Sequence, residues 1–190
     1  DDLGLGDGAA CLLEVPVVRA EPVAPRTDRR ARIEPFIGSR VRDWSAGCAA
    51  SVFGVLYTAV PEAGMIAMRT DGGESIRAAV LGEYRPDTDC PGSALTDWLA
   101  EQARTRDLGG YGVGLQRLIF EDGRVAGAAV GTASETTLIR ARRGVALSTA
   151  AVPAGASWPT QPDLRGTVAQ VAIVSRTGSR FGRVELLAGT

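Results

Sequence analysis

Short runs of strand-forming residues, separated by glycine and Asp-Gly turns, recur along this chain of 190 residues and restrict the folds available to it. Runs of this kind, bounded by turn residues, predict β-strands and hairpins. We expect strands at residues 11–18, 52–60, 64–69, 75–81, 115–121, 124–131, 136–142, 144–149, 168–175 and 183–187. The three consecutive runs between 52 and 81 predict a β-meander, and the run at 144–149 is typical of a strand buried on both faces.

One segment, residues 93–106, has the clear periodicity of an α-helix. Its apolar residues Leu95, Trp98 and Leu99 follow the i, i+3, i+4 spacing that places side chains on one helical face. Residues 40–48 are a shorter candidate. The sum predicts an α+β fold, mostly antiparallel or mixed β-sheet, with one clear helix at 93–106 and one or two short ones.

The length suits a single domain over residues 1–190. We expect it to comprise a strand and an Arg- and Pro-rich arm at 1–32, a cap-like αβ core at 33–150, and a Pro-rich connector with two strands at 151–190. Residues 21–32 carry too few apolar side chains for a core and predict a loop. A net charge of −1, no visible signal peptide and no apolar run near ~18 residues predict a cytoplasmic protein without a nucleic-acid or membrane partner.

The chain contains no His, Lys or Asn, so all 21 of its basic residues are Arg, a bias that suits a GC-rich genome. Without His there is no Ser-His-Asp catalysis and no imidazole metal site, and without Lys there is no Schiff base and no P-loop. The odd number and wide spacing of Cys11, Cys48 and Cys90 argue against a disulfide framework or a zinc site. We expect three reduced thiols, and acid–base chemistry restricted to Asp, Glu, Tyr and Cys with Arg as an electrostatic clamp.

Residues 93–150 combine a helix, a strand that ends in E-D-G-R-V-A-G at 121–127, and I-R-A-R-R-G-V at 139–145. This order resembles FAD-dependent oxidoreductases of the fumarate reductase and 3-ketosteroid dehydrogenase type. The match is good over 93–150 and loose over the cap-like stretch 33–84. The resemblance implies the substrate-side region of an enzyme that passes a hydride between a flavin and a substrate carbon, and it places Thr149 and Ala150 beside the flavin.

Two departures from the family concern the cofactor. Ala150 and Ala151 stand where the family has two glycines, whose missing side chains permit close backbone approach. The G-x-G-x-x-A at residues 4–9 has only three residues before it and no helix pattern after it, and Asp7 would repel a pyrophosphate, so it predicts a loop. We therefore expect that FAD is not held by this chain alone and that no metal is bound. The chain is then either part of a longer flavoprotein, with a missing flavin-binding half as partner, or a flavin-free relative.

Two tyrosines are candidate catalytic residues. Tyr57 lies in a predicted strand, where it is either a proton donor to substrate or a half-buried tyrosine with its hydroxyl at the strand edge. Tyr111 lies in a glycine-rich stretch at 109–114 that either approaches a ligand or connects helix to strand.

Four further residues are candidates for binding substrate or an anion. Trp158 is the tryptophan expected to line a pocket or interface. The turn at 175–183 predicts an anion-binding backbone nest with Arg176, Ser179 and Arg180. A solvated turn is the alternative.

The leading hypothesis is a substrate-covering domain, or a remnant of one, from an FAD-dependent oxidoreductase that acts on a hydrophobic, steroid- or polyketide-like molecule. The alternative is a flavin-free binding protein or cyclase that shapes its ligand in an apolar pocket. A third hypothesis, a structural or subunit-interaction domain such as a homodimer, predicts an exposed apolar patch.

Overall fold

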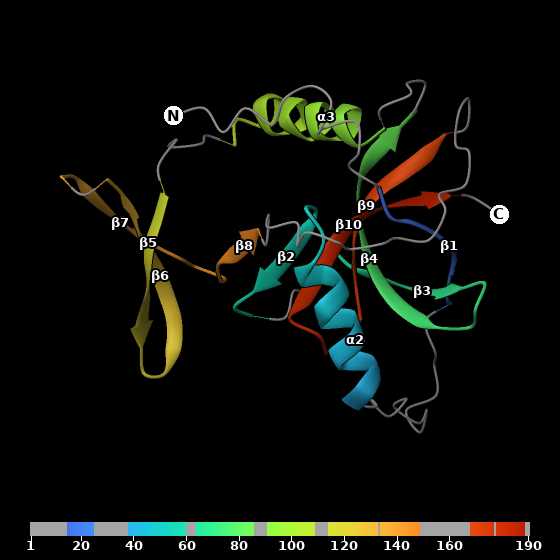
Figure 1. Cartoon of the computed structure of the whole chain (residues 1–190), viewed down its shortest axis with the longest axis horizontal. Helices are drawn as coiled ribbons and strands as arrows, with labels where there is room; N and C mark the ends of the chain where they lie inside the picture. Colours follow the sequence, from blue (N-terminus) through green and yellow to red (C-terminus); the bar gives the residue numbers. More distant parts are fainter. Residues whose placement is uncertain are drawn as a thin grey trace.

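The computed structural model describes residues 15–24, 38–59, 64–85, 91–108, 114–132, 134–148, 168–176 and 178–188. Within these ranges the chain forms two α-helices and ten β-strands in two sheets (Figure 1). In chain order the elements are β1 (Val17–Pro22), α2 (Gly38–Ala49), β2 (Gly54–Tyr57), β3 (Ile66–Thr70), β4 (Ser75–Tyr84), α3 (Pro91–Thr105), β5 (Gly114–Glu121), β6 (Arg124–Gly131), β7 (Thr136–Arg140), β8 (Ala146–Ser148), β9 (Ala169–Ser175) and β10 (Phe181–Ala188). The predicted α+β class, mostly β, is confirmed.

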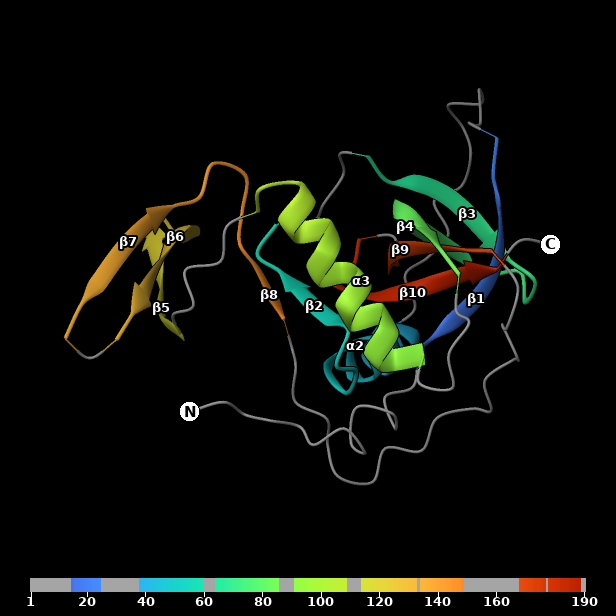
Figure 2. The ribbon, with the colours of Figure 1, turned by 90° about the horizontal axis from the view of Figure 1, so that it is seen from above.

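Five strands of the larger sheet close into a barrel in the order β1-β3-β4-β9-β10, because β1 also pairs with β10 (Figure 2). The β1–β10 pairing is parallel, and the other pairings of the barrel are antiparallel. The two halves of β10 have different neighbours. Residues 186–188 pair with β1, whereas residues 181–183 pair with β2, which in turn pairs with β8. The strand β10 therefore joins the barrel to a two-strand extension.

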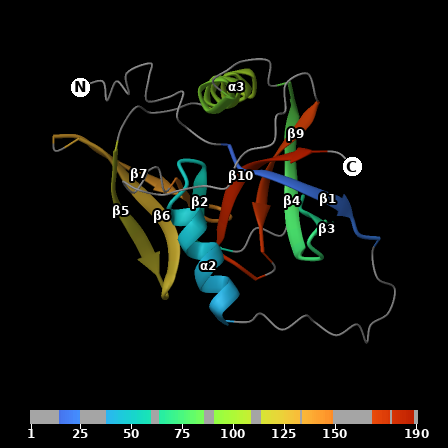
Figure 3. The same cartoon turned by 45° about the vertical axis from the view of Figure 1, so that its right-hand side comes forward.

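Two apolar clusters form the core around the larger sheet, and each is contacted by a different helix. Figure 3 shows these helices apart from each other, with α3 at the top of the view and α2 lower down. In the first, Leu95 of α3 is fully buried beside Val171 and Leu186, and Trp98 packs against the same cluster. A Cβ at Gly82 would lie 3.0 Å from the Trp98 ring, so this position in β4 suits a residue without a side chain. The second cluster lies among β1, β3, β4, β9 and β10, and Trp44 of α2 packs against it.

The smaller sheet is an antiparallel meander in the order β5-β6-β7. Its first turn is Asp122-Gly123, both with positive φ, as the Asp-Gly dipeptide predicts for a tight hairpin. The chain then leaves this sheet and enters β8 at the edge of the larger one (Figure 1). Backbone and side-chain bonds between Thr58 and Val145, of 2.9 and 2.8 Å, hold the entry to β8.

Two expectations from the sequence are wrong, and the bounds of one further strand differ. The strand β2 does not form a meander with β3 and β4; it pairs with β10 and β8, because turn signals report only on neighbours in sequence. The strand β8 is an edge strand with two exposed residues, not a strand buried on both faces. Of the expected strand at 11–18, residues 11–14 lie outside the described residues. The described strand β1 begins at Val17, because Pro16 has no N–H to donate to a ladder, and it continues to Pro22.

Neither described helix is long and apolar enough to cross a membrane.

Candidate functional site

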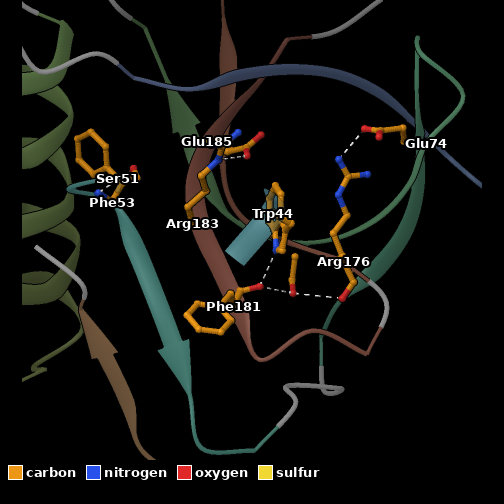
Figure 4. A network of polar contacts seen from close by, with 9 residues as sticks. Trp44, Ser51, Phe53, Glu74, Arg176, Phe181, Arg183 and Glu185 are labelled. Carbon is orange, nitrogen blue, oxygen red and sulfur yellow. Dashed lines mark hydrogen bonds and ion pairs between the residues drawn. The ribbon is translucent and has the colours of Figure 1, made fainter. Parts of the chain in front are cut away.

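The helix α2 packs on β10 and β2 and places Trp44 against the start of β10. The Trp44 indole Nε1–H donates a 3.0 Å hydrogen bond to the carbonyl oxygen of Phe181. The guanidinium groups of Arg176 and Arg183 lie 5.0 and 5.1 Å from the ring centroid, and Figure 4 shows them on either side of the indole. Both distances are within the range of cation–π attraction. The indole therefore binds two cations and one carbonyl group at once.

Each of these arginines has a carboxylate partner (Figure 4). Arg176 Nη2 lies 2.5 Å from Glu74 Oε2, and Arg183 Nε lies 2.5 Å from Glu185 Oε1. The Glu185 side chain is only 4% exposed, whereas that of Glu74 is 44% exposed. The charges of the cluster cancel, and the Arg183–Glu185 pair is the one whose disruption would leave a charge largely buried.

The turn between β9 and β10 is held by two serine hydroxyl groups. Ser175 Oγ and Ser179 Oγ donate to the Phe181 carbonyl at 2.9 and 3.1 Å, and Ser179 Oγ accepts the Phe181 N–H at 3.0 Å. Gly178, with φ +76°, provides the left-handed position of the turn. The Ser179 hydroxyl predicted to bind an anion is thus engaged inside the turn.

Cys48 lies one helical turn after Trp44 on α2, and Tyr57 lies on β2, the strand that pairs with the start of β10. Cys48, on the sheet-facing side of α2, is fully buried. The Tyr57 hydroxyl on β2 is also buried and, in the part of the chain that the structure describes, has no hydrogen-bond partner. Burial raises the pKa of Tyr57 to about 12, with the neighbouring Cys48 as a smaller cause. Burial likewise raises the pKa of Cys48 to about 12, against the opposing effect of Arg183. At neutral pH both groups are protonated, so Cys48 is a poor nucleophile and Tyr57 is an O–H donor with no acceptor among the residues that the structure describes.

The close packing of Tyr57 depends on a glycine in β10. A Cβ at Gly182 would lie 3.2 Å from Tyr57 Cε2 and 2.9 Å from the carbonyl oxygen of Val174. A glycine inside a strand often marks such a close approach, and this was the one sequence signal available for Gly182. Nothing in the sequence pointed to Trp44 or Glu185, because their partners become visible only in the folded chain.

Four predicted site residues lie close together in the fold. The backbone N–H of Tyr57 donates a 2.7 Å hydrogen bond to the carbonyl of Arg180, so β2 meets the turn that carries Arg176 and Ser179. Arg176 faces Trp44 and Glu74, whereas the Arg180 side chain is exposed. The other four predicted residues, Tyr111, Thr149, Ala150 and Trp158, lie outside the described residues.

Two open hollows occur elsewhere on the described surface. One of about 380 Å³ lies between β1 and the turn at 70–72, and one of about 500 Å³ lies at the β5–β6 turn beside Arg140. Neither is lined by a predicted site residue. Among the residues with described positions, no group of three or more His, Cys, Asp or Glu side chains is placed to hold a metal ion.

No protein-family model, curated protein or solved structure matches the chain at a significant level. A functional interpretation therefore depends on the residues and geometry described above.

Proposed function

We propose that this chain is a substrate-covering domain, or a remnant of one, from an FAD-dependent oxidoreductase that acts on a hydrophobic, steroid- or polyketide-like molecule. The observation that carries the proposal is the order α3–β5–β6–β7–β8 over residues 91–148. A helix, an antiparallel meander with an Asp-Gly turn, and a strand that leaves the meander for another sheet follow one another on the residues that carry the resemblance.

The location of β8 at the edge of the larger sheet supports a flavin next to the residues that follow this strand. In the sheet, β8 is an edge strand. The next residues along the chain are Thr149 and Ala150, which the resemblance places beside the cofactor. In the family FAD supplies hydride exchange with the substrate carbon. Because Ala150 and Ala151 add methyl groups where the family has glycines, we propose that a separate flavin-binding half provides most of the contacts to FAD.

Tyr57 is the residue best suited to bind an oxygen of the substrate. Its hydroxyl is desolvated, protonated at neutral pH and without a partner among the described residues, and a ketone oxygen or an enolate would provide an acceptor. An oxyanion would gain most, because a hydrogen bond to a charged acceptor is stronger than one to a neutral acceptor. The proposed enzyme is cytoplasmic, with neither nucleic acid nor membrane as partner.

A fluorescence titration tests the proposal. Progesterone, a hydrophobic enone, is titrated into the purified chain while the emission of its three tryptophans is followed. We expect a saturable change, and an affinity about five- to tenfold lower for Tyr57→Phe, the ratio that one hydrogen bond represents. Tyr84→Phe is the matched control, because Tyr84 lies in the apolar cluster below α3. No saturable change in the wild-type chain, or equal affinity for Tyr57→Phe, would contradict the proposal.

A flavin-free binding protein or cyclase is the second candidate, and Ala150 and Ala151 are the observation that favours it. Both candidates use Tyr57, so FAD itself separates them. An enzyme piece should bind FAD once its flavin-binding half is added in trans, and the bound flavin would give bands near 370 and 450 nm, roughly those expected for an oxidised flavin bound by a protein. The flavin-free candidate predicts enone binding that no flavin domain alters.

Exposed apolar side chains on the β5–β6–β7 meander favour a flavin-binding half as the partner of this chain. Leu115, Phe120 and Leu138 are 47%, 63% and 66% exposed, which is unusual for large apolar side chains on one small sheet. We propose that the flavin-binding half covers them; a homodimer is the alternative partner.

A further inference from the structure

The strand β7 forms one edge of the smaller sheet, and in the described part of the chain it pairs with β6 alone. Figures 1 and 2 show it at one side of the molecule, away from the larger sheet. All of its residues except Ile139 are exposed, and Leu138 at its centre is 66% exposed. Because an edge strand has unpaired backbone groups, β7 is open to another strand.

The hydrogen bonds to β6 show which backbone groups of β7 point away from the sheet. The Ala141 N–H donates to the Ala126 carbonyl at 2.8 Å. The Glu135 carbonyl accepts the Thr132 N–H at 2.9 Å. Residues in an antiparallel ladder alternate between bonding to a given neighbour and facing away from it, and the β6–β7 pairing has no register shift. The odd-numbered residues of β7 therefore bond to β6. The outward N–H and C=O groups belong to Thr136, Leu138 and Arg140.

The opposite edge of this sheet, β5, is less suited to pairing with another strand. Its ladder with β6 has register shifts between Leu115 and Arg117 and between Ile119 and Phe120. Such irregularities bend and twist a strand, and they are one way in which proteins protect sheet edges. The strand β7 has neither a register shift nor a proline, so it lacks this protection.

A second copy of this chain offers the same outward groups in a matching order. In the antiparallel register of fullest overlap, Leu138 lies opposite Leu138 of the second copy, and Thr136 lies opposite Arg140. Each of these pairs would exchange two hydrogen bonds, so every outward N–H and C=O group of both strands would find a partner. The two-fold axis would pass between the two Leu138 residues, and the six strands would form one continuous sheet.

The charges of β7 favour this antiparallel arrangement. Glu135 lies just before the strand, whereas Arg140, Arg142 and Arg143 lie at and just after its end, and all four are exposed. Antiparallel pairing brings the acidic end of each copy beside the basic end of the other. Parallel pairing would instead place arginine beside arginine, which is unfavourable. Charge complementarity therefore selects a second copy, in one orientation, as the partner of this edge.

We propose that β7 is a dimerisation edge, at which two copies of this chain pair antiparallel about Leu138. The inference does not rest on the proposed function. Pairing uses the outward backbone groups of β7 and leaves both faces of the meander open, so it is compatible with a flavin-binding half on those faces. A small interface of this kind gives a reversible dimer, with a Kd on the order of 100 μM.

Amide hydrogen exchange of the full chain, followed by NMR at two concentrations, tests the proposal. The three outward N–H groups, of Thr136, Leu138 and Arg140, should exchange about threefold more slowly at roughly 1 mM than at roughly 50 μM, because less monomer is present. The N–H groups of Thr137 and Ile139 bond to β6, so they are internal controls and should be protected equally at both concentrations. Sedimentation velocity on the same samples measures the fraction of dimer.

Two arginine substitutions separate this edge from the rest of the sheet. Leu138→Arg places arginine opposite arginine at the two-fold axis and should abolish the dimer. Leu115→Arg is the matched control, because it adds the same charge at an exposed apolar position on the other edge strand. It should leave the dimer unchanged. A wild-type chain that stays monomeric at roughly 1 mM, a dimer in which the outward N–H groups gain no protection, or equal effects of the two substitutions would overturn the proposal.

Discussion

Substitution of Gly182 by alanine should destabilise the protein, because this position in β10 has no room for a side chain. The added Cβ would lie 2.9 Å from the Val174 carbonyl oxygen and 3.2 Å from the Tyr57 ring. Val174 belongs to β9, which pairs with β10 along its whole length, so neither strand can shift without disturbing the ladder. Overpacking of this kind costs about 1–3 kcal/mol. The lower chain entropy of alanine in the unfolded state offsets about 0.5–1 kcal/mol of that cost.

We therefore expect a net loss of about 1–2 kcal/mol in the free energy of unfolding for Gly182→Ala. Urea unfolding followed by tryptophan fluorescence measures it. Gly47→Ala is the matched control, because its Cβ would be 3.7 Å from the nearest side-chain atom, Arg183 Nη1, and lies in the helix α2. That variant should gain about 0.5–1 kcal/mol, since glycine is a poor helix residue. A neutral or stabilising Gly182→Ala would refute the packing argument.

Three other predictions concern the core, the ion pairs and the buried thiol. Leu95→Ala, at a fully buried position on the core-facing side of α3, should lower the free energy of unfolding by about 2–5 kcal/mol. A loss below about 1 kcal/mol in urea unfolding would mean that α3 is not part of the core. Glu185→Gln should lower the free energy of unfolding by about 2–4 kcal/mol, because it leaves the largely buried Arg183 without its carboxylate partner. Glu74→Gln, in a more exposed pair, should lower it by less than about 1 kcal/mol. Equal losses in the two variants would contradict this ranking. Burial raises the folded-state pKa of Cys48 from 9.0 to about 12, so the stability that the protonated thiol contributes is present below pH 9 and is lost as the pH rises toward 12. Cys48→Ala should therefore show a smaller fall in its urea midpoint between about pH 8 and pH 11 than the wild type shows. Identical falls in the two proteins would contradict the pKa shift.

The sequence predicted elements set by neighbouring residues better than it predicted pairings between distant ones. The helix at 91–105 and the β5–β6 hairpin follow from apolar periodicity and the Asp-Gly turn, which act over a few residues. The pairing of β1 with β10 closes the barrel across most of the chain and has no local signal. The same applies to β2, whose partners β8 and β10 lie far away in sequence.

The candidate site divides in the same way. Tyr57 and the turn with Arg176, Ser179 and Arg180 could be predicted, because tyrosines in strands and arginine-rich turns are visible in the sequence. Trp44 could not, since the carbonyl that it binds is 137 residues away. The sequence also could not show that Arg176 faces an indole instead of solvent, because that depends on where α2 packs.

The central claim, that Tyr57 binds the oxygen of a hydrophobic ketone, is tested most directly by ¹³C NMR of progesterone labelled at its enone carbonyl carbon. A hydrogen bond from a tyrosine withdraws electron density from the carbonyl, so the account predicts a downfield shift of the bound resonance. The shift should be present with the wild-type chain, retained in Tyr84→Phe and lost in Tyr57→Phe. A bound steroid whose carbonyl resonance is the same in the wild type and in Tyr57→Phe, or no bound resonance at all, would contradict the claim.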